Sequence, residues 1–156
     1  MSIYEPAPQP WPDRMLAVFR VVAGLMFFWA GTMKIFNFPP MPPGQPPIEL
    51  MSQVGIGGMM EVVGGILIML GLLTRPVAFV LAGEMAVAYF QFHQPMGLLP
   101  NENGGIPAVL YCFFFLYLVA AGPGAWSVDR MIARSRNPGR MVDDRVTVPR
   151  GERIAT

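Results

Sequence analysis

Four long apolar segments constrain this chain more than any other feature. They run over residues 15–36, 53–73, 76–93 and 106–122, and few charged residues interrupt them. A helix that crosses the roughly 30 Å hydrocarbon core of a bilayer needs about 20 residues, with a range of about 17–25. The segments fit this range, and they lack the polar face that repeats every 3.6 residues in soluble bundles. The sequence therefore predicts an all-α integral membrane protein with a bundle of four transmembrane helices.

The composition agrees with this interpretation. Hydrophobic residues make up 53% of the 156 residues and charged residues only 13%, which is too little polar surface for a soluble domain of this size. A formal net charge of +1 predicts no nucleic-acid partner. The chain has one cysteine, Cys112, and one histidine, His93. These numbers exclude an intrachain disulfide and bis-histidine haem ligation, and the sequence predicts no metal site built from protein groups alone.

The apolar segments divide the chain into three regions. Residues 1–14 form a Pro-rich N-terminal segment, residues 15–122 the transmembrane domain, and residues 123–156 a basic tail. Within the tail, Ser127 and Asp129 suit the N-terminus of a short helix. Because this helix would carry apolar residues beside arginines, we expect it to lie in the membrane interface.

The connections between the segments differ in kind. Six prolines fall between Pro39 and Pro47, a run that predicts a stiff polyproline-like connector at the membrane surface. A lid over a lateral opening, or a docking strip for a partner, is the alternative interpretation. After the second segment, only Thr74 and Arg75 precede Pro76, so we expect a tight antiparallel hairpin of the second and third helices.

Basic residues are distributed unevenly over the predicted loops. If both termini are cytoplasmic, ten of the 11 lysines and arginines fall on or near that side, and Lys34 falls on the other. Such an excess follows the positive-inside rule. The sequence therefore predicts a multi-pass protein of the bacterial cytoplasmic (inner) membrane with both termini in the cytoplasm.

Four ionisable residues lie within or at the edges of the apolar segments. Each costs roughly 2.5–3.5 kcal/mol near the centre of an inserted helix, so we expect them to face inward and to pair. Counting about 1.5 Å per residue puts Arg20 and Glu84 in the cytoplasmic half, which predicts a structural ion pair between them. Glu61, Lys34 and His93 fall in the outer half and are predicted to form a polar cluster there.

Small residues share helix faces with these charges, at about 100° per residue. One face of the first helix carries Arg20, Gly24, Phe27, Gly31 and Lys34. One face of the second carries Gly57, Glu61, Gly64, Gly65 and Ile68. Glycines at this spacing allow two helix backbones to approach closely.

The outer cluster supplies the candidate catalytic residues, which are Glu61, His93 and Lys34. A histidine titrates near neutrality and a carboxyl group in an apolar wall can pass protons, whereas a neighbouring lysine opposes that transfer. A purely structural ion pair is the other interpretation. Glu84 and His93 are nine residues apart, about 180° round a helix, so the sequence predicts that they do not share one site.

Aromatic residues gather at the outer end of the third segment and in the fourth. Tyr89, Phe92 and Tyr111 are candidates to form a flat slot for a quinone head group. Packing against lipid and core is the commoner use of such rings, and it stays open here.

Motifs in a fixed order resemble those of the DoxX family of small four-helix membrane proteins. They are Arg20-x3-Gly24-x6-Gly31-x2-Lys34, Glu61 with Gly64-Gly65, Gly71-Leu72-Leu73-Thr74-Arg75, and Gly122-Pro123-Gly124 followed by Ser127-x-Asp129. The family often has Gly-Glu at the start of the fourth helix, whereas Gly105 is followed here by Ile106-Pro107. No role of that glutamate carries over to this chain.

The resemblance implies a membrane redox setting, since relatives include a subunit type of thiosulfate:quinone oxidoreductase and proteins linked to oxidant defence. It favours a protein that interacts with quinone through the outer cluster, has no intrinsic cofactor and is either a catalytic or a supporting part of a quinone-linked oxidoreductase. A non-catalytic accessory subunit of a larger membrane complex is the first alternative, and a small-molecule or proton transporter is the second. The expected partners are the lipid bilayer and other membrane subunits or a second copy of the chain.

Overall fold

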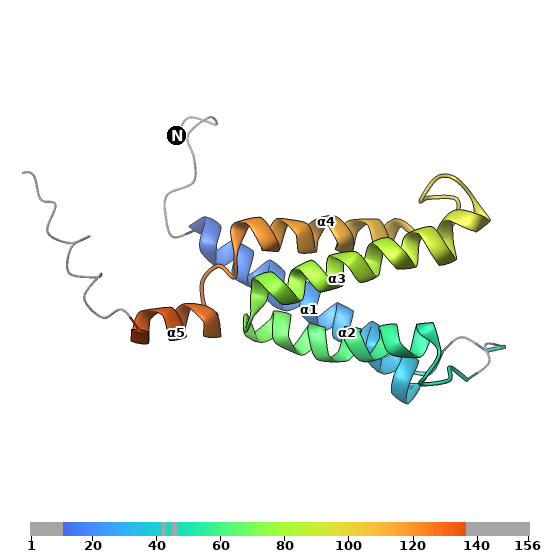
Figure 1. Cartoon of the computed structure of the whole chain (residues 1–156), viewed down its shortest axis with the longest axis horizontal. Helices are drawn as coiled ribbons and strands as arrows, with labels where there is room; N and C mark the ends of the chain where they lie inside the picture. Colours follow the sequence, from blue (N-terminus) through green and yellow to red (C-terminus); the bar gives the residue numbers. More distant parts are fainter. Residues whose placement is uncertain (1–10, 42, 45–46, 137–156) are drawn as a thin grey trace, which may run out of the picture.

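The computed structural model describes residues 11–41, 43–44 and 47–136, and this part of the chain is helical without strands (Figure 1). Its α-helices are α1 (Trp11–Phe36), α2 (Gln53–Leu70), α3 (Thr74–Ala88), α4 (Ile106–Ala121) and α5 (Val128–Arg136). A π-helical turn, η1 (Tyr89–His93), and a 3-10 turn, η2 (Gln94–Met96), extend α3. The predicted N-terminal segment up to residue 10 and the tail from residue 137 lie outside the described residues.

All four apolar segments are helical in the structure. Of the helices described, α1 and α2 are long and apolar enough to cross a membrane by themselves, whereas α4 is apolar but shorter. The first helix begins at Trp11 rather than at residue 15, and Asp13 in its first turn suits the positive end of the helix dipole. The second ends earlier than predicted, at Leu70, because Gly71 adopts the left-handed conformation (φ 65°) that stops a helix.

The helices pack as two pairs. α1 lies mainly against α2, and α3 lies mainly against α4 (Figure 1). Phe27 of α1 joins the pairs, because its ring meets the ring of Phe115 of α4 edge-on, with centroids 5.0 Å apart. We call the end of the bundle with the α1–α2 and α3–α4 connections the outer end, and the end with the α2–α3 turn the inner end.

Glycines bring α1 and α2 together as the sequence predicts. A Cβ atom at Gly31 would lie 2.7 Å from the carbonyl oxygen of Gly58, and one at Gly65 would lie 2.8 Å from the Cα of Phe28. Real Cβ atoms do not approach so closely, so larger residues at either position would force the helices apart. The glycine spacing predicted a close approach of helix backbones, and the structure shows that approach between α1 and α2.

The outward faces of the bundle are apolar on every helix from α1 to α4. Large hydrophobic side chains stay more than half exposed there, among them Phe19, Met26, Val63, Phe79, Leu110 and Phe113. In water such a surface would be an extensive hydrophobic patch, whereas in a bilayer it faces lipid tails.

Candidate functional site

Arg20 is fully buried at the inner end, close to the α2–α3 turn. Its Nη1 donates to the carbonyl oxygens of Ile68 at 2.5 Å and Met69 at 2.7 Å, and its Nη2 donates to that of Trp126 at 3.1 Å. The last carbonyls of a helix lack partners within the helix and attract cations. Arg20 therefore closes the end of α2 and ties it to the segment before α5.

The predicted Arg20–Glu84 ion pair is wrong, and helix depth explains why. Glu61 lies nine residues before the end of α2 at Leu70, and Glu84 lies ten residues after the start of α3 at Thr74. At about 1.5 Å per residue, both carboxyl groups are about 14–15 Å from the turn. Arg20 lies at the turn itself, so Glu84 shares its depth with Glu61 instead.

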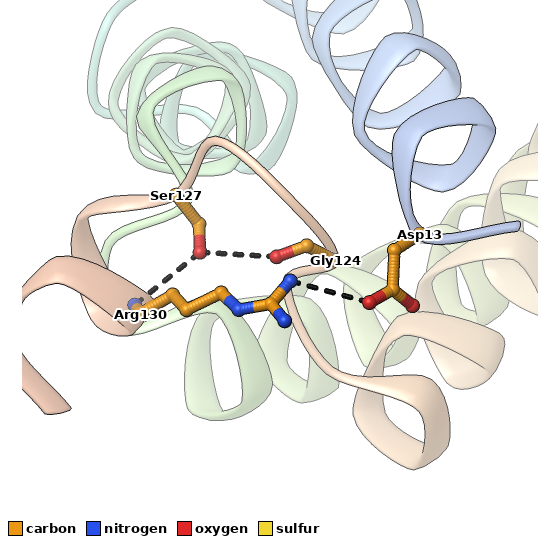
Figure 2. Close-up of polar contacts among 4 residues, drawn as sticks. All are labelled: Asp13, Gly124, Ser127 and Arg130. Atoms are coloured by element: carbon orange, nitrogen blue, oxygen red, sulfur yellow. Dashed lines mark hydrogen bonds and ion pairs between the residues drawn. The ribbon is translucent and has the colours of Figure 1, made fainter. Parts of the chain in front are cut away.

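Asp129 lies in the first turn of α5, as predicted, and it also binds the start of α3. Its carboxylate accepts hydrogen bonds from the N–H groups of Leu73 and Thr74, both at 2.8 Å, at the start of α3. Burial alone would raise the pKa of Asp129, but these bonds from Thr74 and Leu73 outweigh it and lower the pKa below its ordinary value. Ser127 does start α5 as predicted, since its Oγ accepts from the N–H of Arg130 at 3.3 Å (Figure 2).

Three of the sequence motifs meet in this arrangement, which we call the turn network: Arg20, the Gly71–Thr74 turn and the Ser127–Asp129 segment. The N–H of Asp129 donates to the carbonyl oxygen of Gly71 at 2.9 Å. A Cβ atom on Gly71 would lie 2.6 Å from Arg20 Nη1 and 2.6 Å from the Cβ of Ser127. The turn network is thus a closely packed structural element that makes most of its hydrogen bonds inside the chain. Arg20 Nε and Thr74 Oγ1 are buried without a hydrogen-bond partner among the described residues.

A second set of charged residues surrounds a cavity of about 520 Å³ between the outer halves of α2 and α3, which we call the outer cavity. Its titratable residues come from different elements: Lys34 from α1, Glu61 from α2, Glu84 from α3 and His93 from η1. The remaining lining residues are Gln53, Val54, Gly57, Met85, Val87, Ala88 and Phe92. Among the described residues, no three of His, Cys, Asp or Glu are arranged to hold a metal ion.

Lys34 and Glu61 form a close ion pair in the outer cavity, with Nζ and Oε1 2.5 Å apart. The Glu61 side chain is 4% exposed and that of Lys34 is 32% exposed. The second carboxyl oxygen of Glu61 and the Oε2 of Glu84 are both buried without a hydrogen-bond partner among the described residues. Most buried polar atoms have such partners, so two unpaired carboxyl oxygens beside one cavity are an unusual feature.

His93 lies in the same cavity as Glu84, contrary to the prediction that the two do not share one site. The π-helical turn explains this, because its wider turns rotate each residue by less than 100° and shift His93 round the axis. The Nδ1 of His93 lies 3.0 Å from the carbonyl oxygen of Asn103. A carbonyl only accepts, so Nδ1 donates and Nε2 is the ring nitrogen left for another group.

Only one of the three predicted aromatic contacts lies at the cavity, and that is Phe92. Tyr89 instead donates its hydroxyl to the carbonyl oxygen of Leu98 at 3.2 Å. Tyr111 packs its ring against Phe27, with centroids 5.1 Å apart. Both tyrosines therefore stabilise the bundle and its outer loop.

Sequence reasoning missed two residues of the outer cavity, Glu84 and Gln53. Gln53 begins α2 and donates through its amide to the side-chain oxygen of Gln91 in η1, which links the two helices at the outer rim. The near-equal distances of Glu61 and Glu84 from the α2–α3 turn were the signal that could have found Glu84.

An apolar groove of about 500 Å³ lies between the same two helices and extends toward the inner end. Every lining residue is apolar, including Met60 and Leu67 of α2 and Val77 and Leu81 of α3. Met60 is next to Glu61 in sequence, and Leu81 is about one helical turn from Glu84. The polar cavity and the apolar groove thus both lie between α2 and α3, and they share no lining residue.

Several known proteins are similar to this chain in sequence. The sequence model of the family described as DoxX matches residues 15–94. An uncharacterized protein of Haemophilus influenzae is 41% identical over 117 residues, which cover 73% of this chain and 87% of the relative. The inner membrane protein YqjF of Escherichia coli is 30% identical over 127 residues, or 77% of this chain and 93% of the relative. An uncharacterized membrane protein of Mycobacterium tuberculosis is 26% identical over an alignment of 160 positions that covers 86% of this chain and 95% of the relative.

No solved structure matches the chain. The family match covers about half of the 156 residues, and two relatives of at least 30% identity are covered over most of their length. The motifs that form the turn network and the outer cavity lie largely inside the matched region. The chain therefore belongs to the DoxX family of membrane proteins.

Proposed function

We propose that the protein interacts with a quinone in a membrane redox system and that the outer cavity holds the quinone head group. The observation that carries this proposal is a pair of carboxyl oxygens, one each from Glu61 and Glu84, that are buried without a hydrogen-bond partner in the described part of the chain. They line one cavity with the ammonium group of Lys34 and the imidazole of His93. Groups that are polar, buried and unpaired within the chain are suited to an external polar ligand.

The cavity supplies the groups that quinone chemistry requires. Reduction of a quinone to a hydroquinone takes two electrons and two protons. A carboxyl group of Glu61 or Glu84 and the Nε2 of His93 can donate or accept these protons at the two oxygens of the ring. Lys34 places a positive charge beside the oxygens as negative charge develops on them. The electrons come from a partner protein or an external reductant.

The apolar groove supports the same class of ligand. A membrane quinone carries a polar head and a long apolar tail. The polar outer cavity of about 520 Å³ and the apolar groove of about 500 Å³ both lie between α2 and α3. A head in the cavity with its tail along the groove would match each part of such an amphiphile to a lining of its own polarity.

The proposed orientation places this site near the outer face of the membrane. In this orientation, α1 to α4 all cross the bilayer, and both termini face the cytoplasm. The exposed apolar side chains on α3 and α4, such as Phe79 and Phe113, support crossing by these shorter helices. Lys34 at the outer end and Arg14, Arg75 and Arg130 at the inner end support the orientation through the positive-inside rule.

A binding titration tests the proposal. The full chain is purified in mild detergent and titrated with a short-tailed quinone, with Glu61→Gln as the test variant and exposed Glu102→Gln as its control. We expect wild type and Glu102→Gln to bind alike, and Glu61→Gln to bind about tenfold more weakly, because one hydrogen bond to a charged group is lost. Absence of binding to wild type, or equal binding by Glu61→Gln, would overturn the proposal.

A further inference from the structure

A basic pocket at the inner end is separate from the outer cavity and adjoins the turn network, with which it shares Ser127. It has a volume of about 350 Å³ and lies between the start of α1 and the start of α5. Among the described residues, Arg14 of α1 and Arg130 and Arg134 of α5 line it, together with one carboxylate, Asp13. The pocket therefore has three positive charges and one negative charge, a net charge of +2.

Hydrogen bonds fix the walls of this basic pocket. Nη1 of Arg130 donates to Oδ2 of Asp13 at 3.2 Å, which joins α5 to α1 (Figure 2). The N–H of Ala125 donates to the carbonyl oxygen of Asp13 at 3.1 Å. Ser127 donates through Oγ to the carbonyl oxygen of Gly124 at 3.3 Å. The segment between α4 and α5 is therefore held against α1, and the pocket has a defined shape.

The arginines of the basic pocket have unequal freedom to bind a ligand. Arg130 is engaged by Asp13, and the guanidinium of Arg14 lies over the ring of Trp11, 5.8 Å from its centroid. A cation–π contact orients a guanidinium without using its hydrogen-bond donors. Arg134 is four residues after Arg130 in α5, so both side chains leave the helix on one face. Among the described residues, no hydrogen bond or ion pair engages the guanidinium of Arg14 or Arg134, so both can donate to a ligand in the pocket.

The surroundings of the basic pocket match the surface of a bilayer. Trp126 and Met131 line it and are each 68% exposed. In α5, Val128 and Ile132 lie on the side of the helix away from Arg130 and Arg134. Tryptophan beside arginines, on a short amphipathic helix, is typical of the head-group region.

We infer that the basic pocket binds the phosphodiester head group of an anionic phospholipid, with Arg14 and Arg134 as its ligands and Arg130 as a positioning residue. Guanidinium groups bind phosphate through paired hydrogen bonds, and the excess of two positive charges complements an anionic head group. The exposed Trp126 and Met131 would contact the acyl chains of the same lipid. This inference is independent of the proposed quinone site.

Lipid retention by the purified full chain tests the inference. The protein is exchanged into detergent with equal amounts of phosphatidylglycerol and phosphatidylcholine, and the bound lipid is counted by native mass spectrometry. The variants are Arg14→Gln with Arg134→Gln, and Arg134→Gln alone in case the double variant unfolds. Arg136→Gln is the matched control, because it removes the same charge from the same helix but does not line the pocket.

We expect wild type and Arg136→Gln to retain phosphatidylglycerol over phosphatidylcholine, and the double variant to retain about tenfold less, because charge-assisted bonds are lost. Arg134→Gln alone should fall between them. Equal losses in Arg136→Gln and Arg134→Gln would overturn the inference, since they would mean general charge attraction. Displacement of the lipid by millimolar inorganic phosphate would also overturn it and assign the pocket to a free anion.

Discussion

The turn network and the outer cavity both hold charged groups between the same helices, but the ends of these side chains are paired within the chain more completely in the turn network. At the inner end, both terminal nitrogens of Arg20 and both oxygens of Asp129 have hydrogen-bond partners in the chain, and only Arg20 Nε and Thr74 Oγ1 are buried without one among the described residues. At the outer end, one oxygen of Glu61 pairs with Lys34, while the Oε2 atoms of Glu61 and Glu84 have no partner among the described residues.

This difference separates stability from function. A buried polar group whose hydrogen bonds are made within the chain contributes to the folded state, and its loss is costly. A buried polar group left unpaired lowers stability and is retained where it binds or reacts. Variants at the inner end should therefore mainly change the free energy of unfolding, and variants at the outer end should mainly change ligand binding.

The largest effect should come from Arg20→Met. It would remove the side-chain donor to the carbonyl oxygen of Met69 and one of the two donors to that of Ile68, so we expect the free energy of unfolding to fall by about 3–5 kcal/mol. Denaturant unfolding in detergent measures it. Arg75→Met removes an exposed arginine near the same turn and should change stability by less than about 0.5 kcal/mol.

A charge swap adds a second test of Arg20. The double variant Arg20→Glu with Glu84→Arg should be no more stable than Arg20→Glu alone, because the two groups lie at different depths. Recovery of stability in the double variant would mean that they are paired, and would remove the distinction between the two regions.

The variant Asp129→Asn should lower the free energy of unfolding by a smaller amount, about 1–2 kcal/mol at neutral pH. The reason is that the N–H groups of Leu73 and Thr74 would no longer donate to a charged carboxylate. The folded state lowers the pKa of Asp129, so its contribution is complete above the ordinary pKa of about 3.9 and is lost as the pH falls through the folded value. The stability difference between wild type and Asp129→Asn should therefore shrink below about pH 4. A difference that is constant from pH 7 to pH 3 would contradict this account.

The smallest effect should come from Gly57→Ala, compared with Gly83→Ala. Both changes raise helix propensity by about 1 kcal/mol. A Cβ atom at Gly57 would lie 3.2 Å from Oε1 of Glu84, whereas one at Gly83 meets no atom within 4 Å. Gly57→Ala should therefore weaken quinone binding a few-fold, while Gly83→Ala should leave it unchanged. Equal affinities would show that the position of Glu84 does not matter for binding.

Much of the fold was predictable from local sequence. The apolar segments predicted the helices, and the glycines on the faces of the first and second segments predicted that helix backbones could approach closely. The tight α2–α3 hairpin was also predictable, because Gly71 and Pro76 leave little room for a loop. These features depend on residues close in sequence, where helical geometry relates position to direction.

The site was harder to predict because it depends on relations between helices. Arg20 binds backbone carbonyl oxygens, which every residue has, so the sequence alone does not indicate which residues it binds. The π-helical turn that brings His93 to the side of Glu84 follows no local pattern we recognised. Glu84 itself was predictable, since counting from both ends of one hairpin places it level with Glu61.

One thermal-shift experiment tests the central claim most directly. A short-tailed quinone is added to wild type, Glu84→Gln and Asp129→Asn in the same detergent, and the unfolding midpoint is recorded with and without it. The account predicts that Asp129→Asn unfolds at a lower temperature but is still stabilised by quinone, whereas Glu84→Gln unfolds near the wild-type temperature and is no longer stabilised. Quinone stabilisation that survives in Glu84→Gln or disappears in Asp129→Asn would contradict the account.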